Sequence, residues 1–298
     1  MAIRRAQGWV AVWGMVVCFA GCGVEIPARS GLQSAHDALV VPNGRELNGR
    51  ELNGVSYSAA TVHGLLSTLA LEGSELVATS GRSVRRGTGL VGAILFGHTA
   101  DSFVVLRVEG VGAEGDVFRY QVSAATRTGW QPLCGHDADG NRTAALALAG
   151  TWDYRSGAVG GGSHSNDGGN FTFACEGYAL AKCVALGYAP WRSVDGRSLA
   201  DFHQACTRML RADYCGNGTS YTEDGVLIDV YDDVGLQADT ESWAFEAEWV
   251  PGGAACLNAP RRAPERAILC AAALRKPGCG DTADFGTGTL LMDESPAR

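Results

Sequence analysis

The sequence predicts an α+β fold in two parts: an N-terminal antiparallel β unit (a small sheet or barrel), then a disulfide-rich α+β unit with a stapled helical pair. Two observations support this prediction. Residues 55–131 show period-two alternation and contain no cysteine, as expected for half-buried antiparallel strands. Residues 132–280 contain eight of the ten cysteines and two segments whose apolar residues recur at helical spacing.

Residues 1–21 are typical of a secretory signal peptide. Arg4 and Arg5 form a positive start, and residues 9–20 form an apolar run that is shorter than the about 20 helical residues needed to cross a membrane. The run ends in Phe-Ala-Gly before Cys22, which resembles the lipobox of bacterial lipoproteins, where the cysteine carries the lipid. The sequence therefore predicts a lipid anchor at Cys22. Ordinary signal cleavage just before this residue and a retained membrane anchor are the alternatives.

Residues 22–54 are expected to be a lipid-anchored tether that carries an internal repeat. Asn-Gly-Arg-Glu-Leu occurs at 43–47 and again at 48–52, and Asn-Gly is a strong turn signal because both residues tolerate positive φ. Repeat architectures need about three or more units to bury a continuous core, so this repeat is interpreted as a ribbon that caps the next unit. No later apolar run approaches membrane-spanning length, so the chain is expected to be membrane-tethered and otherwise soluble.

The strands of the first unit are predicted from alternation and from the turns between them. Residues 65–70 and 75–80 flank a Leu-Glu-Gly-Ser turn and are expected to form a hairpin. Residues 103–109 and 117–122 are expected to pair across a glycine-rich connection, with the aromatic side chains of the second strand on one face.

The second unit is expected to contain two helices among several strands. One helix is predicted over residues 176–186, and the other begins at Ser198, which starts a sequence resembling a capping box. The glycine-rich residues 156–169 are expected to be a mobile loop, and residues 281–298 a weakly ordered tail. The strands are expected at 143–148, 170–174, 226–231 and 242–249.

The eight cysteines of the second unit are expected to form four disulfides. Two antiparallel helices would bring Cys183 near Cys206 and Cys175 near Cys215, because the spacings are nearly symmetric about the connection between the helices. Structural zinc sites favour close pairs such as Cys-x₂-Cys, which this chain lacks, so neither a metal nor a cofactor is expected. Pairing among the other four is left open: Cys134, Cys256, Cys270 and Cys279.

The charge of the chain excludes nucleic acid as a partner. The formal net charge is −8, and it becomes −10 if cleavage removes Arg4 and Arg5. Nucleic-acid binding requires clustered Lys and Arg to neutralise phosphates, but the only lysines are Lys182 and Lys276, and arginines cluster only at 82–86.

A short motif near the middle of the second unit points to a family. Arg211 to Gly216 reads Arg-Ala-Asp-Tyr-Cys-Gly, and further stretches such as Phe-Thr-Phe-Ala-Cys175 and His203-Gln-Ala-Cys206 accompany it. In these features the chain resembles the ADYC domain family of exported proteins, known chiefly from myxobacteria. The resemblance implies an exported location and a cysteine-rich domain. It does not identify any catalytic residues in this chain.

Three side chains are candidates for chemistry. His203 lies one helical turn before Cys206, and Asp229 and Asp232 form an acidic cluster together with Asp233. A histidine and paired carboxylates are the groups used for acid–base hydrolysis. The structural alternatives are a disulfide cysteine beside a polar-face histidine, and a strand that runs into an acidic turn.

The function favoured by the sequence is a non-catalytic binding or structural module of the cell envelope, at the bacterial outer membrane or cell surface. Its expected partners are the membrane, through the lipid, and an envelope polysaccharide or protein. The alternative is an extracellular hydrolase of polysaccharide or peptide with His203, Asp229 and Asp232 in its site. This alternative is less favoured because the sequence contains no recognisable hydrolase motif.

Overall fold

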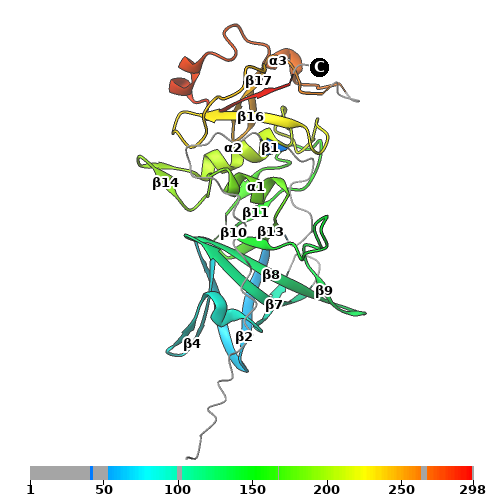
Figure 1. The fold of residues 1–298 in the computed structure, drawn as a ribbon, viewed down its shortest axis with the longest axis vertical. Helices are drawn as coiled ribbons and strands as arrows, with labels where there is room; N and C mark the ends of the chain where they lie inside the picture. The colour runs from blue at the N-terminus through cyan, green and yellow to red at the C-terminus, as the bar shows by residue number, and fades with distance from the viewer. Residues whose placement is uncertain (1–40, 43–52, 99–102, 167, 263–266, 297–298) are drawn as a thin grey trace, which may run out of the picture.

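The computed structural model describes residues 41–42, 53–98, 103–166, 168–262 and 267–296 (Figure 1). Strands take up 42% of these residues and helices 13%, so the predicted α+β class is wrong and the fold is mostly β. The C-terminal half is not organised by a stapled helical pair. Its strands are short, and several pair with segments far away in the sequence, such as residues 229–232 with residues 291–294. Such pairing leaves little local signal.

A closed six-stranded barrel forms the first layer of the molecule. Its order is β13-β10-β8-β7-β6-β2, and pairing of Phe171 in β13 with Val55 in β2 closes it. A meander of three strands extends from β2, and β9 pairs with β8. The barrel strands are β2 (Val55–Val62), β6 (Ile94–His98), β7 (Phe103–Glu114), β8 (Val117–Thr126), β10 (Ala145–Ala149) and β13 (Asn170–Cys175); the added strands are β3 (Leu65–Glu72), β4 (Glu75–Ser80), β5 (Ser83–Arg85) and β9 (Gly129–Pro132).

The predicted hairpins are present in the barrel and in its extension. β3 pairs with β4 across the expected turn, and β7 pairs with β8. β10 and β13, which complete the barrel, follow residue 131, so the barrel takes strands from both of the units expected from the sequence.

Aromatic rings fill the barrel interior. Tyr57 stacks on Phe171 with ring centroids 4.1 Å apart, and Phe173 packs edge-on against both Tyr57 and Tyr120. Gly97 is required beside this cluster, because a Cβ at that position would lie 2.5 Å from a methyl carbon of Val55.

A five-stranded sheet forms the opposite end of the molecule (Figure 1). Its order is β1-β16-β19-β17-β18, which places the C-terminal strand β19 in the middle. The expectation that residues 281–298 form a weakly ordered tail is therefore wrong: β19 is too short to show a period, and it is ordered by a neighbouring strand on each side. The strands are β1 (Val41–Pro42), β16 (Leu227–Asp232), β17 (Ala244–Val250), β18 (Gly253–Leu257) and β19 (Leu291–Ser295).

Two helices lie between the barrel and this sheet (Figure 1). Helix α1 (Ala179–Ala185) places Leu180 and Val184 against the outer surface of the barrel, and helix α2 (Ala200–Leu210) packs on the sheet. The remaining short elements are η1 (Gly87–Leu90), β11 (Thr151–Trp152), β12 (His164–Ser165), β14 (Ser193–Val194), β15 (Arg197–Ser198), α3 (Ala271–Leu274) and η2 (Thr282–Thr287).

Four disulfides crosslink the described residues. Cys183 in α1 is joined to Cys206 in α2, as predicted. The predicted bond between Cys175 and Cys215 is wrong, because Cys175 ends strand β13 and Cys215 follows a turn after α2, so neither extends the helix that the symmetric-spacing argument assumed. The other bonds are Cys134–Cys175, Cys215–Cys270 and Cys256–Cys279. Four buried or half-buried disulfides indicate an oxidising compartment.

The predicted signal peptide, the predicted lipid-anchor residue Cys22 and the Asn-Gly-Arg-Glu-Leu repeat at 43–52 lie outside the described residues. Of the expected tether, Val41–Pro42 pairs with β16 at the edge of the five-stranded sheet. None of the described helices has the length and apolar character needed to cross a membrane.

Candidate functional site

The candidate histidine lies inside the protein. His203 is 1% exposed, its Nε2 lies 3.0 Å from the Leu180 carbonyl oxygen, and its ring packs beside Trp152. Burial lowers the pKa of His203 to about 4, so the imidazole is neutral at neutral pH. Its neighbour Cys206 is in a disulfide and is not a nucleophile.

The candidate aspartates hold loops together. Asp229 is buried and accepts hydrogen bonds from the backbone N–H groups of Thr240 and Glu241, at 2.8 and 2.7 Å. Asp232 accepts one from the Gln237 N–H and one from the Tyr188 hydroxyl. Each of the two carboxylates accepts hydrogen bonds from its own set of neighbouring groups. The structural alternative, a strand that runs into an acidic turn, therefore explains the presence of both aspartates.

The Ala-Asp-Tyr-Cys motif begins where α2 ends. Ala212 has a φ of +49°, which turns the chain sharply after the helix. Asp213, fully buried, accepts hydrogen bonds from the backbone N–H groups of Asn217 and Gly218 and pairs with the buried guanidinium of Arg208. The motif aspartate therefore joins the end of α2 to the loop that follows it.

The motif tyrosine leads to a second buried cluster of charged groups. The Tyr214 hydroxyl donates to Glu246 at 2.8 Å, and Glu246 is held by Arg261, which also binds Asp293. The side chains of Glu246, Arg261 and Asp293 are 0% exposed. This cluster ties β17 and β19 to the segment after β18, and its enclosure points to a structural role.

The glycine-rich loop is attached to the same motif. Arg208 donates to the Gly161 carbonyl and to the Ser163 hydroxyl, and Gln204 donates to the Gly162 carbonyl at 2.9 Å. A Cβ at Gly161 would lie 2.2 Å from a backbone oxygen of Arg155, so only glycine fits there. The expectation of a mobile loop is therefore wrong for this part of it, because buried side chains of α2 bind its backbone.

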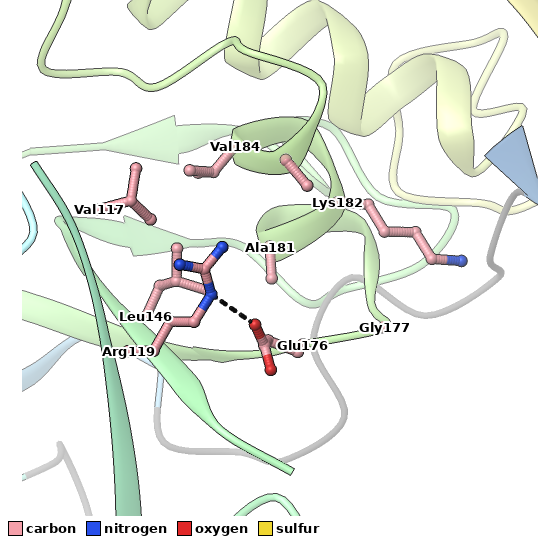
Figure 2. A pocket seen from close by; sticks show the side chains of 9 residues that line it. Val117, Arg119, Leu146, Glu176, Gly177, Ala181, Lys182 and Val184 are labelled. Carbon is pink, nitrogen blue, oxygen red and sulfur yellow. Dashed lines mark hydrogen bonds and ion pairs between the residues drawn. The ribbon is translucent and has the colours of Figure 1, made fainter. Parts of the chain in front are cut away.

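A pocket lies where α1 crosses the outer surface of the barrel (Figure 2). It has a volume of about 180 Å³. Its apolar wall comes from β8, β10 and α1, and its charged rim from β8, from the turn before α1 and from α1 itself. The lining residues are Val117, Leu146, Ala181, Val184 and Ala185 on the apolar side, and Arg119, Glu176, Gly177 and Lys182 at the rim.

An ion pair forms the polar edge of the pocket. Arg119 Nε donates to Glu176 Oε1 at 2.9 Å, and a second carboxylate, that of Glu114, lies 3.4 Å from the same guanidinium. Lys182 extends away from this pair in Figure 2. Burial lowers the pKa of Lys182, and the charge of Asp224 opposes that shift. Opposite charges balance at the rim, so the pocket suits an uncharged apolar group better than an ion.

A second cavity, of about 390 Å³, lies beside β18 and η2. Three groups in its wall, Glu248, Cys256 and Cys279, have potential ligand atoms within 4.8 Å of one another. The two sulfurs form one disulfide and are not thiolates, and both Glu248 oxygens already accept hydrogen bonds, from Gly280 and Thr289. This arrangement does not fit a metal.

Sequence reasoning did not identify the residues of the pocket. Arg119 lies on the polar side of a predicted strand, and Val184 on the apolar side of a predicted helix. Neither pattern tells which strand meets which helix, so no local signal pointed to the pocket.

Comparison with protein families explains the motif. The ADYC domain matches residues 87–263, which is more than half of the chain. The match leaves out β2, which closes the barrel, and β19, the middle strand of the sheet. Comparisons with curated proteins and with solved structures find no match. On the strength of the family match, the chain belongs to the ADYC domain family.

Proposed function

We propose that this chain is an exported, lipid-anchored envelope protein that binds another envelope protein by taking one of its apolar side chains into the pocket between α1 and the barrel. The four disulfides support export, since such bonds persist in oxidising compartments. The positive start, the short apolar run and Cys22 support a lipid anchor at the cell envelope.

The size of the pocket is the observation that carries the binding proposal. A cavity of about 150 Å³ is enough to hold benzene, whereas drug-sized ligands need about 300 Å³ or more. At about 180 Å³ the pocket accommodates one leucine or phenylalanine side chain. The Arg119–Glu176 pair at its edge supplies a donor and an acceptor that the backbone of a bound peptide can meet.

The geometry favours binding over hydrolysis. A hydrolase needs an acid or base that can reach substrate, and His203 is buried against a carbonyl oxygen while Asp229 is occupied by backbone donors.

Lipid anchoring predicts a clear effect of replacing Cys22. In a bacterial host the C22S variant should lose incorporation of labelled fatty acid and move from the membrane fraction to the soluble fraction, because the acyl chains supply the membrane affinity. Labelling and fractionation of wild type and C22S measure this; C18S is the control, since it lies within the apolar run of the signal. Unchanged labelling of C22S would refute the anchor.

Filling the mouth of the pocket should abolish side-chain binding. The probes are N-acetyl-phenylalaninamide and N-acetyl-leucinamide, with N-acetyl-asparaginamide as the polar comparison. In wild type the two apolar probes should produce saturable shifts in the methyl NMR signals of Val117, Leu146 and Val184. In A185W the affinity should fall at least tenfold, because Ala185 lines the pocket from an exposed position of α1.

The matched control is A272W, which places the same large side chain on an exposed position of α3, outside the pocket. It should bind the probes like wild type. Methyl signals that do not shift in wild type, or that shift equally in A185W, would contradict the proposed binding site.

A further inference from the structure

A second surface of the barrel carries aromatic and charged side chains that the pocket does not use. We call it the aromatic face and define it by Phe96, His98, Phe103, Arg107 and Trp130, which lie on β6, β7 and β9. Residues paired across antiparallel strands point to the same side, and His98 pairs with Phe103 while Phe96 pairs with Val105. Arg107 is two residues beyond Val105 on the same side of β7.

The strand register places this face on the outside of the barrel. The residues that alternate with it, Leu95, Leu106 and Val108, are fully buried in the barrel core. Arg107 pairs with Ser123 of β8, and Ala125, on the same side, pairs with Trp130 of β9. The outward row therefore crosses four neighbouring strands, a width of about 14 Å at the usual strand spacing of about 4.8 Å.

The rings at one end of this face form a cluster in which the Phe96 and Phe103 rings are nearly parallel and the His98 ring is tilted by 57° against that of Phe103. The Phe96 and Phe103 rings are inclined by only 18° with centroids 6.3 Å apart, and the His98 ring centroid lies 5.0 Å from that of Phe103. Phe103 is 55% exposed. The interior of the barrel is already filled by other aromatic residues, so an exposed phenylalanine here adds nothing to the core.

The other end combines a ring with charged groups. The Arg107 guanidinium lies over the Trp130 ring at 4.6 Å from its centroid, and Arg107 Nε donates to Glu109 Oε1 at 2.8 Å. The face thus combines a cluster of rings at one end with a guanidinium and a carboxylate at the other, where the guanidinium lies over one side of the Trp130 ring.

We propose that the aromatic face binds a glycan chain. A sugar ring presents apolar C–H faces that stack on aromatic rings and hydroxyls at its edge that bond to arginine and carboxylate groups, which matches the arrangement on this face. The width of about 14 Å suits a short run of linked sugars. A second copy of the chain fits less well, because the Arg107–Glu109 pair would have to be desolvated in the contact. This inference is independent of the proposed peptide pocket.

The test measures binding of three soluble oligosaccharides, cellohexaose, chitohexaose and maltohexaose, by isothermal titration calorimetry. Wild type should bind at least one of them, and F103A and W130A should each bind it at least tenfold more weakly. V84A is the control, because Val84 is an apolar residue on β5 with similar exposure, 52%, outside the aromatic face. The pocket variant A185W should keep the wild-type affinity for the sugar.

Three outcomes would overturn this inference. Wild type could bind none of the three sugars at millimolar concentration, or F103A and W130A could bind as well as wild type. Sedimentation could instead show a dimer that F103A dissociates, which would assign the face to self-association. Circular dichroism of each variant separates a loss of contact from a loss of fold. F103A is expected to match wild type because Phe103 is largely exposed, whereas Trp130 is half-buried and its variant needs this check most.

Discussion

Replacing Arg208 by methionine is expected to destabilise the fold by about 3–5 kcal/mol, the usual cost of removing one partner of a buried ion pair. Arg208 is 1% exposed and Asp213 is 0% exposed, so the variant removes the directly bonded guanidinium from a buried carboxylate and leaves only the more distant Arg211, at 3.9 Å. The Gly161 carbonyl loses its hydrogen bond from the same side chain. Because Arg208 joins α2, the glycine-rich loop and the Ala-Asp-Tyr-Cys motif, the effect should be global.

Urea unfolding followed by circular dichroism measures this change as a shift of the midpoint at constant slope. The control is R155M. Like Arg208, Arg155 pairs with an aspartate close to it in the chain, Asp153, but the Arg155 side chain is exposed. It should leave the midpoint nearly unchanged, because solvent screens exposed pairs. Equal midpoints for R208M and R155M would show that the buried pair does not stabilise the fold.

The variant R261M is expected to lose a similar amount of folding stability at neutral pH. Part of this stability should return when the pH is lowered. Arg261 binds both Glu246 and Asp293, and all three side chains are 0% exposed. Burial raises the pKa of both carboxyls, and the Arg261 charge opposes that shift. Without the guanidinium both pKa values should rise further, and about 3–5 kcal/mol should be lost near pH 7.

The sign of the pH dependence follows from proton linkage. A carboxyl whose pKa is higher in the folded state than in the unfolded state stabilises the fold below the unfolded pKa, and this contribution is lost as the pH rises through the folded pKa. The deficit of R261M relative to wild type should therefore be largest near pH 7 and shrink as the pH falls toward about 4, the ordinary range for these groups.

The control for this second variant is its neighbour in the chain. Arg262 forms an exposed pair with Glu223, so R262M should follow the wild-type curve at every pH. A deficit of R261M that stays constant between pH 7 and pH 5 would show that the two carboxyls are not the cause of the instability.

The local elements were predictable from the sequence where the signal lies within one segment. The turn between β3 and β4 and the alternation in β7 and β8 depend on neighbouring residues, and both hairpins are present. The two helices were also found, with ends a few residues shorter than expected. The bond between Cys183 and Cys206 followed from the placement of these helices.

The sequence did not reveal the pairings between distant segments. β19 has five residues and no period of its own, and it becomes the middle of a sheet because β16 and β17 flank it. The bond between Cys134 and Cys175 depends on the packing of the barrel strands, which spacing along the chain does not report.

For this protein, composition and local pattern were enough to indicate the family, the cysteine-rich character and the hairpins, because each of these is encoded in residues that are close together. The fold class, three of the four disulfides, the pocket beside Arg119 and the aromatic face arose from packing. All of these features depend on which strands and helices pack together, and this is set by the burial of whole faces against one another. Separation along the chain is not the reason, because the predicted Cys183–Cys206 bond and the Cys256–Cys279 bond both span 23 residues.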